Sequence, residues 1–447
     1  MNLHELMKKF SVKEMDEVKV YTLDEEFTGV VMHSRGNKIF VLKLKNGYNI
    51  GIHATRVTKI EKLGEEGKEE RKIEAKKVEH KPDLPSITIL HSGGTIASRI
   101  DYRTGAVSAS VKQEEIVEHV PELEKIANIK SKSILDMLSG NMRFYHFKKI
   151  AKAIEEEAKE GVKGIILGHG TDTMHYSSAA LSFMLEGINI PVIMVGSQRS
   201  SDRGSSDSAM NLVCAAEFIT KTDFSGVGIC MHEGPSDDNC VILPGTKTRK
   251  MHSSRRDAFK AINDIPIARI NYETRKIEFL KKDYPKRDEG REFKLKDKIE
   301  EKVGLLKIHP DMKPEEIEFF EEKGYKGLVL EGTGLGNAPV VAKEEGTEIN
   351  AKILEAIRKL VDKGCVVVMT SQTIYGRVQM NVYSYGKDCL EAGVIPGEDM
   401  TPETAFIKLA WLLGNYSKEE AKELVGKNLR GEITPCSTIK GFDVEFK

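Results

Sequence analysis

The sequence predicts an α/β protein whose body has two domains, preceded by a small β-barrel domain. Short apolar runs at 86–91 and 164–168 alternate with amphipathic segments such as 147–158. Strands that alternate with helices in this way are typical of a parallel sheet. Residues 1–60 instead hold several short β-like runs separated by turns, and the Asn-Gly pair at 46–47 favours a hairpin. At 447 residues the chain is also too long for one ordinary core.

Changes in composition divide the chain into six segments. A stretch rich in Lys and Glu follows the β-like runs, and it has too little apolar content to form a core. A second charged and irregular stretch separates two α/β units. The predicted segments are a small SH3-like β-barrel domain at 1–60, a charged linker at 61–84, an α/β domain with the catalytic motifs at 85–275, a linker at 276–302, a second α/β domain at 303–425 and a tail at 426–447.

The overall composition argues against several classes of protein. The net charge of −1 gives no whole-molecule attraction to nucleic acid or membrane. No apolar run reaches the ~18 residues of a membrane-spanning helix, and we expect no signal peptide. The six cysteines include no Cys-x-x-Cys pair, so we expect reduced, mostly buried thiols in a cytoplasmic protein. No metal or flavin signature occurs in the sequence.

The stretch Gly164-Ile-Ile-Leu-Gly-His-Gly-Thr-Asp-Thr-Met174 is the strongest candidate for a functional site. Its apolar start predicts a buried strand, and Gly168 and Gly170 then allow a tight turn and a close approach to a ligand. A helical pattern follows, so small polar groups stand at the carboxyl end of a strand, where open α/β sheets bind ligands. Taken alone, the stretch fits an N-capped turn equally well, because Thr and Asp cap helices.

A second predicted strand ends in similar residues. Gly93-Gly-Thr95 follows the strand at 86–91, as Gly170-Thr-Asp172 follows the strand at 164–168. A Thr hydroxyl is a weak nucleophile at neutral pH and needs a neighbouring base, which a desolvated Lys near a carboxylate can supply. Backbone amides at glycine turns can stabilise the oxyanion of an acyl transfer. These residues alone favour no particular Lys.

Together, Ser92-Gly-Gly-Thr-Ile-Ala97 and Leu167-Gly-His-Gly-Thr-Asp-Thr-Met174 resemble the paired signature of the asparaginase/glutaminase family. The first motif of that family usually begins with Thr, where this chain has Ser92. The similarity continues at Glu331-Gly-Thr-Gly-Leu-Gly-Asn337 and Leu390-Glu-Ala-Gly-Val-Ile-Pro-Gly-Glu-Asp-Met400. The resemblance implies an asparaginase-like two-domain α/β body that hydrolyses a side-chain amide.

The resemblance also assigns catalytic roles. It implies that Thr95 is the primary nucleophile. It further implies that Thr171, Asp172 and a Lys form a second arm, which activates a nucleophile and supports the tetrahedral intermediate. Counting back from the aromatic residue of the following Asp-Ala-Phe places this Lys at Lys250 and not at Lys247.

Substrate-binding residues follow from the same resemblance. Ser139 stands at the position that binds the substrate carboxylate, and Asp172 would also meet the substrate α-amino group. Gly94 and Gly170 directly precede the two catalytic Thr residues. Asn337 matches a residue that reaches the site from a partner subunit.

Two positions depart from the family pattern. Gly140 has no side chain where the family usually has a polar one, which leaves room for a different approach of the substrate. The tyrosine that often closes the family's mobile lid has no counterpart at 105–106. Tyr102 is close by, and whether it acts in the lid stays open.

The β-rich extension and the linker are unusual within that family, and they resemble those of the archaeal-type glutamyl-tRNA(Gln) amidotransferases. This resemblance implies a glutaminase that supplies ammonia to a partner kinase/transferase subunit, with asparagine as a poorer amide donor. The partner would bind ATP and Mg²⁺ and convert Glu-tRNA(Gln) to Gln-tRNA(Gln), and tRNA(Gln) would contact mainly the partner. A homodimer within a heterotetramer is implied, and no cofactor or metal is expected in this chain.

Two rival functions stay open. In a free-standing L-asparaginase, the extension and the linker would have no purpose. An RNA- or protein-binding scaffold with an inactive site is the other rival, but the four implied catalytic residues are all present.

Three further features have simpler interpretations. We expect His169 to shape its turn and not to catalyse. The loop Gly332-Thr-Gly-Leu-Gly336 resembles a dinucleotide-binding loop, but it has Asn337 where such a loop needs its third glycine. We therefore do not expect it to bind NAD. The basic run at 249–256 could contact RNA, but an ion-paired surface is the more common use of such residues.

Overall fold

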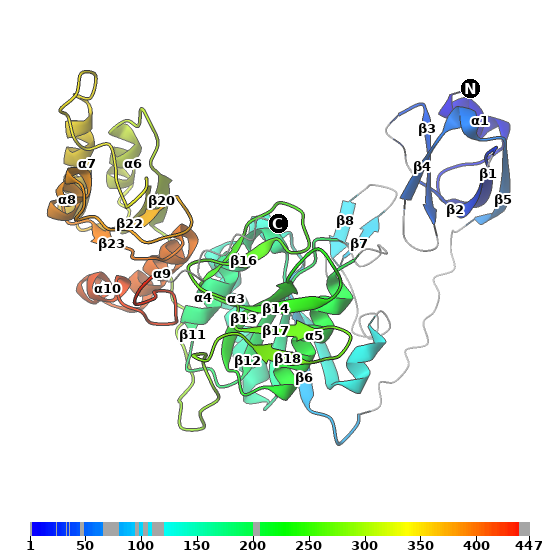
Figure 1. The fold of residues 1–447 in the computed structure, drawn as a ribbon, viewed down its shortest axis with the longest axis horizontal. Coiled ribbons are helices and arrows are strands. Elements are labelled where there is room, and N and C mark those ends of the chain that lie inside the picture. The colour runs from blue at the N-terminus through cyan, green and yellow to red at the C-terminus, as the bar shows by residue number, and fades with distance from the viewer. Residues whose placement is uncertain are drawn as a thin grey trace.

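The computed structural model describes residues 2–23, 25–32, 34, 36–44, 49–65, 80–93, 98–101, 106–109, 120–199 and 206–437. Figure 1 shows three units in chain order, namely a small β-domain, a large α/β domain and a smaller α/β domain. No helix in these residues is long and apolar enough to cross a membrane.

The N-terminal β-domain is an antiparallel sheet around its own core. It begins with helix α1 (Leu3–Lys9), which Asn2 and Glu5 cap reciprocally. Val18 and Val20 alternate with half-buried residues along the first strand and lie fully buried in the core. The sheet has the order β4-β3-β2-β1-β5, with strands β1 (Asp16–Tyr21), β2 (Glu26–Met32), β3 (Ile39–Leu44), β4 (Asn49–His53) and β5 (Lys59–Glu65), and a 3₁₀ turn, η1 (Ala54–Arg56), precedes β5.

Strand β5 corrects the boundary expected at residue 60. It pairs with β1 through Val20↔Ile60 and Lys19↔Glu61, so the β-domain continues into the segment 61–84 that was expected to be a linker. The charged composition hid this strand, because Lys59 and Lys62 are exposed while Ile60 is buried. The Lys62 ammonium also contacts the buried Asp16 carboxylate at 2.9 Å. Residues 66–79 of the expected linker lie outside the described residues.

The large domain is built on an eight-stranded sheet in the order β18-β17-β14-β13-β12-β10-β6-β9. Five of its strands run parallel, so their carboxyl ends lie along one edge. Ile165 and Leu167 of β10 face one core of the domain and Ile166 faces the other, which explains the unbroken apolar run. The parallel strands are β6 (Ser86–His91), β9 (Asn128–Ser133), β10 (Gly164–Gly168), β12 (Pro191–Val195) and β13 (Gly226–His232).

One side of this sheet departs from the parallel arrangement that the sequence predicts. Strands β14 (Asn239–Pro244), β17 (Ala268–Asn271) and β18 (Ile277–Phe279) are antiparallel to their neighbours. Residues 233–238 connect β13 to β14, and they are too few for the crossover of about a dozen residues that a parallel pair needs. Strand β18 also lies inside the segment 276–302 that was expected to be a linker.

Helices cover both faces of the large sheet. Helices α3 (Phe144–Lys159) and α4 (Met174–Met184) contribute to the core that includes Leu167. Helix α5 (Ser208–Lys221) belongs to the core on the opposite face, with Ile166. The site therefore stands on a three-layer scaffold.

The smaller domain has a four-stranded parallel sheet. Its strands are β20 (Val303–Lys307), β21 (Gly327–Gly332), β22 (Val366–Ser371) and β23 (Ile395–Pro396). Helices α6 (Glu315–Glu322), α7 (Asn350–Asp362) and α8 (Ser384–Glu391) form a core with this sheet. Helix α9 (Pro402–Asn415) contacts strands β20, β21 and β22 of this sheet and also α4 of the large domain. Trp411 of α9 stacks on Phe183 at 5.4 Å between ring centroids, so one core joins the two domains.

The segment after α10 (Lys418–Val425) is part of the fold, although the tail at 426–447 gave no sign of a role in the sequence. Lys408 of α9 and Glu432 are both fully buried, and their charged groups lie 2.6 Å apart. Arg430 contacts Glu186 of the large domain at 2.7 Å. Polar composition did not predict this burial, because charged side chains can be buried when they are paired.

Shorter elements complete the two domains. Three two-stranded sheets are β7 (Ser98–Asp101) with β8 (Ala106–Ala109), β11 (Leu185–Glu186) with β19 (Lys294–Leu295), and β15 (Thr248–Lys250) with β16 (Phe259–Ala261). The 3₁₀ turns are η3 (Pro121–Lys125), η4 (Ser139–Asn141) and η5 (Thr171–Thr173).

Candidate active site

The candidate site lies where β6 and β10 end side by side. Ser92 follows β6, and its backbone N–H and its hydroxyl donate to the carbonyl of Gly168 at 2.9 and 3.0 Å. Gly93 has a φ of +94°, and a Cβ at this residue would lie 2.4 Å from the carbonyl oxygen of Met137. Only glycine fits that backbone and that space. The two glycine turns that the sequence singled out are therefore neighbours.

His169 shapes the turn before Thr171. Its buried ring donates through Nδ1–H to the carbonyl of Gly170 at 2.6 Å, and Nε2 then accepts from the Ser177 hydroxyl at 2.8 Å. Burial lowers the pKa of His169 to about 4, so the ring is neutral at neutral pH. This confirms the expectation that His169 holds the turn.

Lys250 contacts both Thr171 and Asp172, the two residues that follow the turn. Its Nζ lies 2.8 Å from Thr171 Oγ1 and 2.8 Å from Asp172 Oδ1. Lys250 ends the short strand β15, where it pairs with the fully buried Phe259. Lys247 lies elsewhere, against Asp399. The structure therefore places Lys250, and not Lys247, beside Thr171.

Differences in exposure separate the three side chains. Thr171 and the Lys250 side chain are about a tenth exposed, at 9% and 10%, whereas the Asp172 side chain is 74% exposed. A partly desolvated amine beside a hydroxyl can exchange a proton with it. The open carboxylate of Asp172 can both neutralise an ammonium at Lys250 and contact a cationic group of a ligand.

Ser139 lies against the same turn. A Cβ on Gly170 would lie 2.7 Å from Ser139 Oγ, and the hydroxyl of Thr173 donates to the Ser139 carbonyl at 2.8 Å. Ser139 is only 5% exposed, while its neighbour Gly140 is exposed with open space where a Cβ would stand. Ser139 therefore lies beside the turn that carries Thr171, and its role toward a substrate carboxylate stays a prediction.

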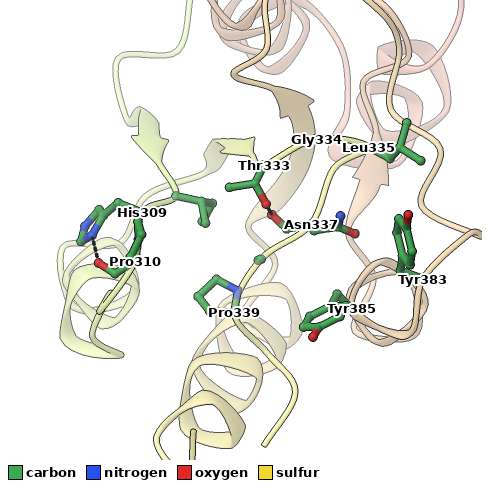
Figure 2. A pocket seen from close by; sticks show the side chains of 11 residues that line it. His309, Pro310, Thr333, Gly334, Leu335, Asn337, Pro339, Tyr383 and Tyr385 are labelled. Atoms are coloured by element: carbon green, nitrogen blue, oxygen red, sulfur yellow. Dashed lines mark hydrogen bonds between the residues drawn. The ribbon is translucent and has the colours of Figure 1, made fainter. Parts of the chain in front are cut away.

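Asn337 belongs to another part of the molecule. It follows β21 and lines a cavity of about 600 Å³ with His309, Tyr383 and Tyr385 (Figure 2). Among the described residues of this chain, no hydrogen bond joins Asn337 to Thr171, Asp172 or Lys250. The expectation that a second copy of the chain brings Asn337 to the site stays a prediction. Thr95, Gly94 and Tyr102 lie outside the described residues.

The basic residues around Lys250 are ion-paired. Arg255 contacts Asp257 at 2.8 Å and Arg256 contacts Asp237 at 2.5 Å. The ring of His252 accepts hydrogen bonds from the backbone N–H groups that follow it. An ion-paired surface is therefore the better interpretation of this run. No group of three or more His, Cys, Asp or Glu side chains within the described part of the chain is placed to hold a metal ion.

Three buried histidines near the site predict a loss of stability in acid. Burial lowers the pKa of His91 and His169 to about 4 and that of His175 to about 3. A histidine in the unfolded chain titrates near pH ~6.5, so the unfolded state binds more protons below that pH. Stability should be complete above pH ~6.5 and fall towards pH ~4, by up to about 1.4 kcal/mol per pH unit for each histidine.

Urea denaturation at pH 7, 6 and 5 measures this loss. His175→Leu should remove about one proton of the uptake on unfolding, because the imidazole that titrates is gone. His309→Gln is the control. His309 is exposed, and its pKa is raised by the Pro310 carbonyl first and by Glu316, so this variant should not reduce the proton uptake on unfolding. A free energy of unfolding that stays constant from pH 7 to pH 5 would contradict the prediction.

Comparison with known proteins shows to which class of protein the two α/β domains belong. Residues 86–284 match the family model "Asparaginase, N-terminal" and residues 302–424 match the "Glutaminase/Asparaginase C-terminal domain". The structure of the thermostable L-asparaginase from Thermococcus kodakarensis aligns with a TM-score of 0.69 and 31% identity, over 78% of this chain and 100% of that chain. L-asparaginase I from Vibrio cholerae aligns with a TM-score of 0.67 and 28% identity, over 78% and 99%. The body of the chain is an asparaginase-type amidohydrolase.

The N-terminal β-domain shows to which family of asparaginase-type proteins the chain belongs. Residues 12–63 match the "GatD N-terminal domain". The GatD subunit of the glutamyl-tRNA(Gln) amidotransferase of Pyrococcus furiosus is 46% identical, over 99% of this chain and 100% of that protein. The corresponding GatD subunit of Thermococcus kodakarensis is 48% identical, over 93% and 92%. The chain belongs to the GatD family of glutamyl-tRNA(Gln) amidotransferase subunits.

Proposed function

We propose that this chain hydrolyses the side-chain amide of glutamine and supplies the ammonia to a partner subunit that converts Glu-tRNA(Gln) into Gln-tRNA(Gln). The observation that carries the chemistry is the contact of Lys250 Nζ with both Thr171 Oγ1 and Asp172 Oδ1 at 2.8 Å. The match of residues 12–63 to the GatD N-terminal domain supports the amidotransferase context.

The proposed reaction passes through an acyl-Thr intermediate. The Thr95 hydroxyl attacks the amide carbon and gives up its proton, and the leaving nitrogen takes a proton as ammonia departs. Water then adds to the ester, the bond between the acyl carbon and the Thr95 oxygen breaks, glutamate is released and the Thr95 hydroxyl is regenerated. Thr171 and Lys250 move the protons, since a neutral Lys250 amine can accept one from the Thr171 hydroxyl. Asp172 stabilises the ammonium that results.

The substrate would be held by its α-amino and carboxylate groups. The exposed Asp172 carboxylate is suited to the α-amino group, and the Ser139 hydroxyl is suited to the carboxylate. We assign Asn337 of a second copy to the same substrate because the family resemblance implies it; within this chain Asn337 lines the cavity with His309 and Tyr385. We also assign Gly94 and Gly170, which directly precede Thr95 and Thr171 in the sequence, to the substrate pocket.

Gly170→Ala tests the placement of Ser139. The added Cβ would lie 2.7 Å from Ser139 Oγ and 2.8 Å from Ser139 Cβ, so Ser139 must move. We expect KM for glutamine to rise by about tenfold or more, because small displacements at a binding site are costly. Steady-state kinetics measure the effect. Gly234→Ala is the control, because nothing lies within 4 Å of a Cβ at Gly234, and equal KM values for both variants would contradict the assignment.

ATP, Mg²⁺ and the tRNA belong in this proposal to the partner subunit. The relatives are named as one subunit of an amidotransferase, which supports the existence of such a partner. We propose a homodimer of this chain within a heterotetramer. No cofactor is assigned to this chain.

A free-standing L-asparaginase is the alternative function, favoured by the solved structures that resemble the body. Ammonia release by the purified chain separates the two functions when it is measured with glutamine and with asparagine, alone and with the partner and charged tRNA. We expect glutamine hydrolysis that depends on the partner and the charged tRNA. Full turnover of asparagine by the chain alone would reject the amidotransferase role.

A further inference from the structure

The segment that carries Lys250 is fixed to the smaller domain along most of its length. The carbonyl of Thr246 accepts from the Thr404 hydroxyl at 2.9 Å. Lys247 pairs with Asp399, and Arg249 contacts Glu403 at 3.1 Å. The same segment also contacts the large domain, where the Thr248 hydroxyl donates to the Pro244 carbonyl at 2.6 Å and Lys250 contacts Thr171 and Asp172. Residues 246–250 thus form a bridge between the two domains. Lys250, the acid–base group of the proposed mechanism, lies at its end.

The Lys247–Asp399 ion pair is the most buried contact of this bridge. Lys247 Nζ lies 2.5 Å from Asp399 Oδ2 and 3.3 Å from the Asp399 carbonyl, and both side chains are at most 1% exposed. Burial lowers the pKa of Lys247, and the Asp399 carboxylate opposes that effect. A buried charge that loses its partner is strongly unfavourable, so the pair resists separation.

The segment after α10 fixes Asp399 in turn. The Thr434 backbone N–H donates to Asp399 Oδ1 at 3.0 Å, and the Thr434 hydroxyl donates to Oδ2. Arg377 donates to the Thr434 carbonyl at 2.6 Å and to the Pro435 carbonyl at 3.2 Å. Asn263, from the loop after β16, donates to the Asp399 carbonyl at 3.0 Å. Asp399 thus connects the tail to both ends of the β15–β16 hairpin.

We propose that the Lys247–Asp399 pair, held by Thr434, is a positioning device that sets Lys250 against Thr171. Lys247 stands three residues before Lys250, and a strand rises by ~3.3 Å per residue, so the pair lies about 10 Å along the chain from the lysine it positions. Lys250 must keep two contacts of 2.8 Å at once. A displacement of about 1 Å can reduce a rate by about a hundredfold. Weakening the Lys247–Asp399 pair should therefore displace Lys250 and slow the reaction.

This inference rests on the proposed function, in which Lys250 exchanges a proton with Thr171. The simpler interpretation of the pair is that it stabilises the domain interface and nothing more. If the pair only stabilises the interface, breaking it would lower the amount of folded protein. If the pair positions Lys250, breaking it would lower kcat of the folded protein and leave KM unchanged. The two interpretations therefore differ in kinetics measured well below the unfolding temperature.

The test uses Asp399→Asn in the full chain, assembled with its partner if wild-type turnover requires it. We expect kcat for amide hydrolysis to fall by about thirtyfold to a hundredfold, with KM within about twofold. Thr434→Val keeps the ion pair and removes one of its hydrogen bonds, so it should lower kcat by about threefold to tenfold. Glu217→Gln is the matched control, because Glu217 is a buried, ion-paired carboxylate on α5, away from β15, and kcat should be unchanged.

A double-mutant cycle separates a positioning role from a structural one. In a Lys250→Met background, Asp399→Asn should change the residual rate by less than about twofold, because the residue it positions is gone. The same fold-loss in both backgrounds, or a wild-type kcat for Asp399→Asn, would overturn the proposal. If the residual rate is below detection, the split between kcat and KM decides, and if Asp399→Asn does not fold, Thr434→Val carries the test. Inactivity of the wild-type protein on glutamine and asparagine would instead reject the proposed function.

Discussion

Thr171→Val is expected to lower the rate of amide hydrolysis by about a thousandfold or more. The substitution keeps the shape of the side chain and removes the hydroxyl that lies 2.8 Å from Lys250 Nζ. In the proposed mechanism the Thr171 hydroxyl passes protons to and from Lys250, so its loss removes the proton exchange from both halves of the reaction. A loss of this size corresponds to about 4 kcal/mol of transition-state stabilisation. Single-turnover and steady-state ammonia assays measure it.

Thr171→Ser is the matched control for this variant. It retains the hydroxyl, so we expect a rate within about tenfold of the wild type. Thermal unfolding of the Val variant should stay close to that of the wild type, because Val and Thr fill nearly the same volume. Near-normal turnover by Thr171→Val would show that the Thr171–Lys250 contact has no part in catalysis.

Lys250→Met should reduce turnover by a similar factor, of about a thousandfold or more. Met preserves the length and apolar stem of Lys, but it leaves the Thr171 hydroxyl and the Asp172 carboxylate without the amine at 2.8 Å from each. Because Thr171 and Lys250 act as a unit, the double variant should be no slower than either single variant by more than a few-fold, as for other catalytic groups that work together.

Lys260→Met is the control for Lys250. Lys260 lies on the same β15–β16 hairpin, its side chain is 45% exposed, and its ammonium is 3.6 Å from Asp257. A surface pair of this kind contributes little, so kcat should stay within about twofold of the wild type. If the effects of Thr171→Val and Lys250→Met simply multiplied in the double variant, the two residues would act independently and the proposed proton exchange would be wrong.

The elements that position the site could be predicted because each has a local signal. Strand β10 is a short apolar run closed by glycines, and the segments around α3 and α9 have helical periodicity. The antiparallel strand β14 could not be told from a parallel one by its own residues. The short connection at 233–238 was the available signal, since a parallel crossover needs more chain.

Charge misled the sequence interpretation where charged residues are paired. Strand β5 was divided between the barrel and the linker because its sequence is rich in Lys and Glu, although Ile60 is buried. The polar tail gave no sign of a role, but its Glu432 is fully buried with Lys408. Long-range ion pairs of this kind leave no local pattern, because the two partners are far apart in the sequence.

The site itself was predicted in part. The glycine turns and the Thr-Asp pair are visible in the residues, but the choice of Lys250 needed the family resemblance, since β15 is only a short strand. Asp399 and Glu403 were missed as anchors of the Lys250 segment. Nothing in the sequence connects residue 399 to residue 247, and only the packing of the two domains brings them together.

The most direct test of the amidotransferase role is the dependence of Gln-tRNA(Gln) formation on the nitrogen source. The complex of this chain with its partner would be assayed with glutamine or with ammonium chloride, using the wild-type chain and Thr171→Val. We predict that the variant forms Gln-tRNA(Gln) at the wild-type rate from ammonium and about a thousandfold more slowly from glutamine. Equal losses with both nitrogen sources, or no loss with glutamine, would contradict the role of this chain as the source of ammonia.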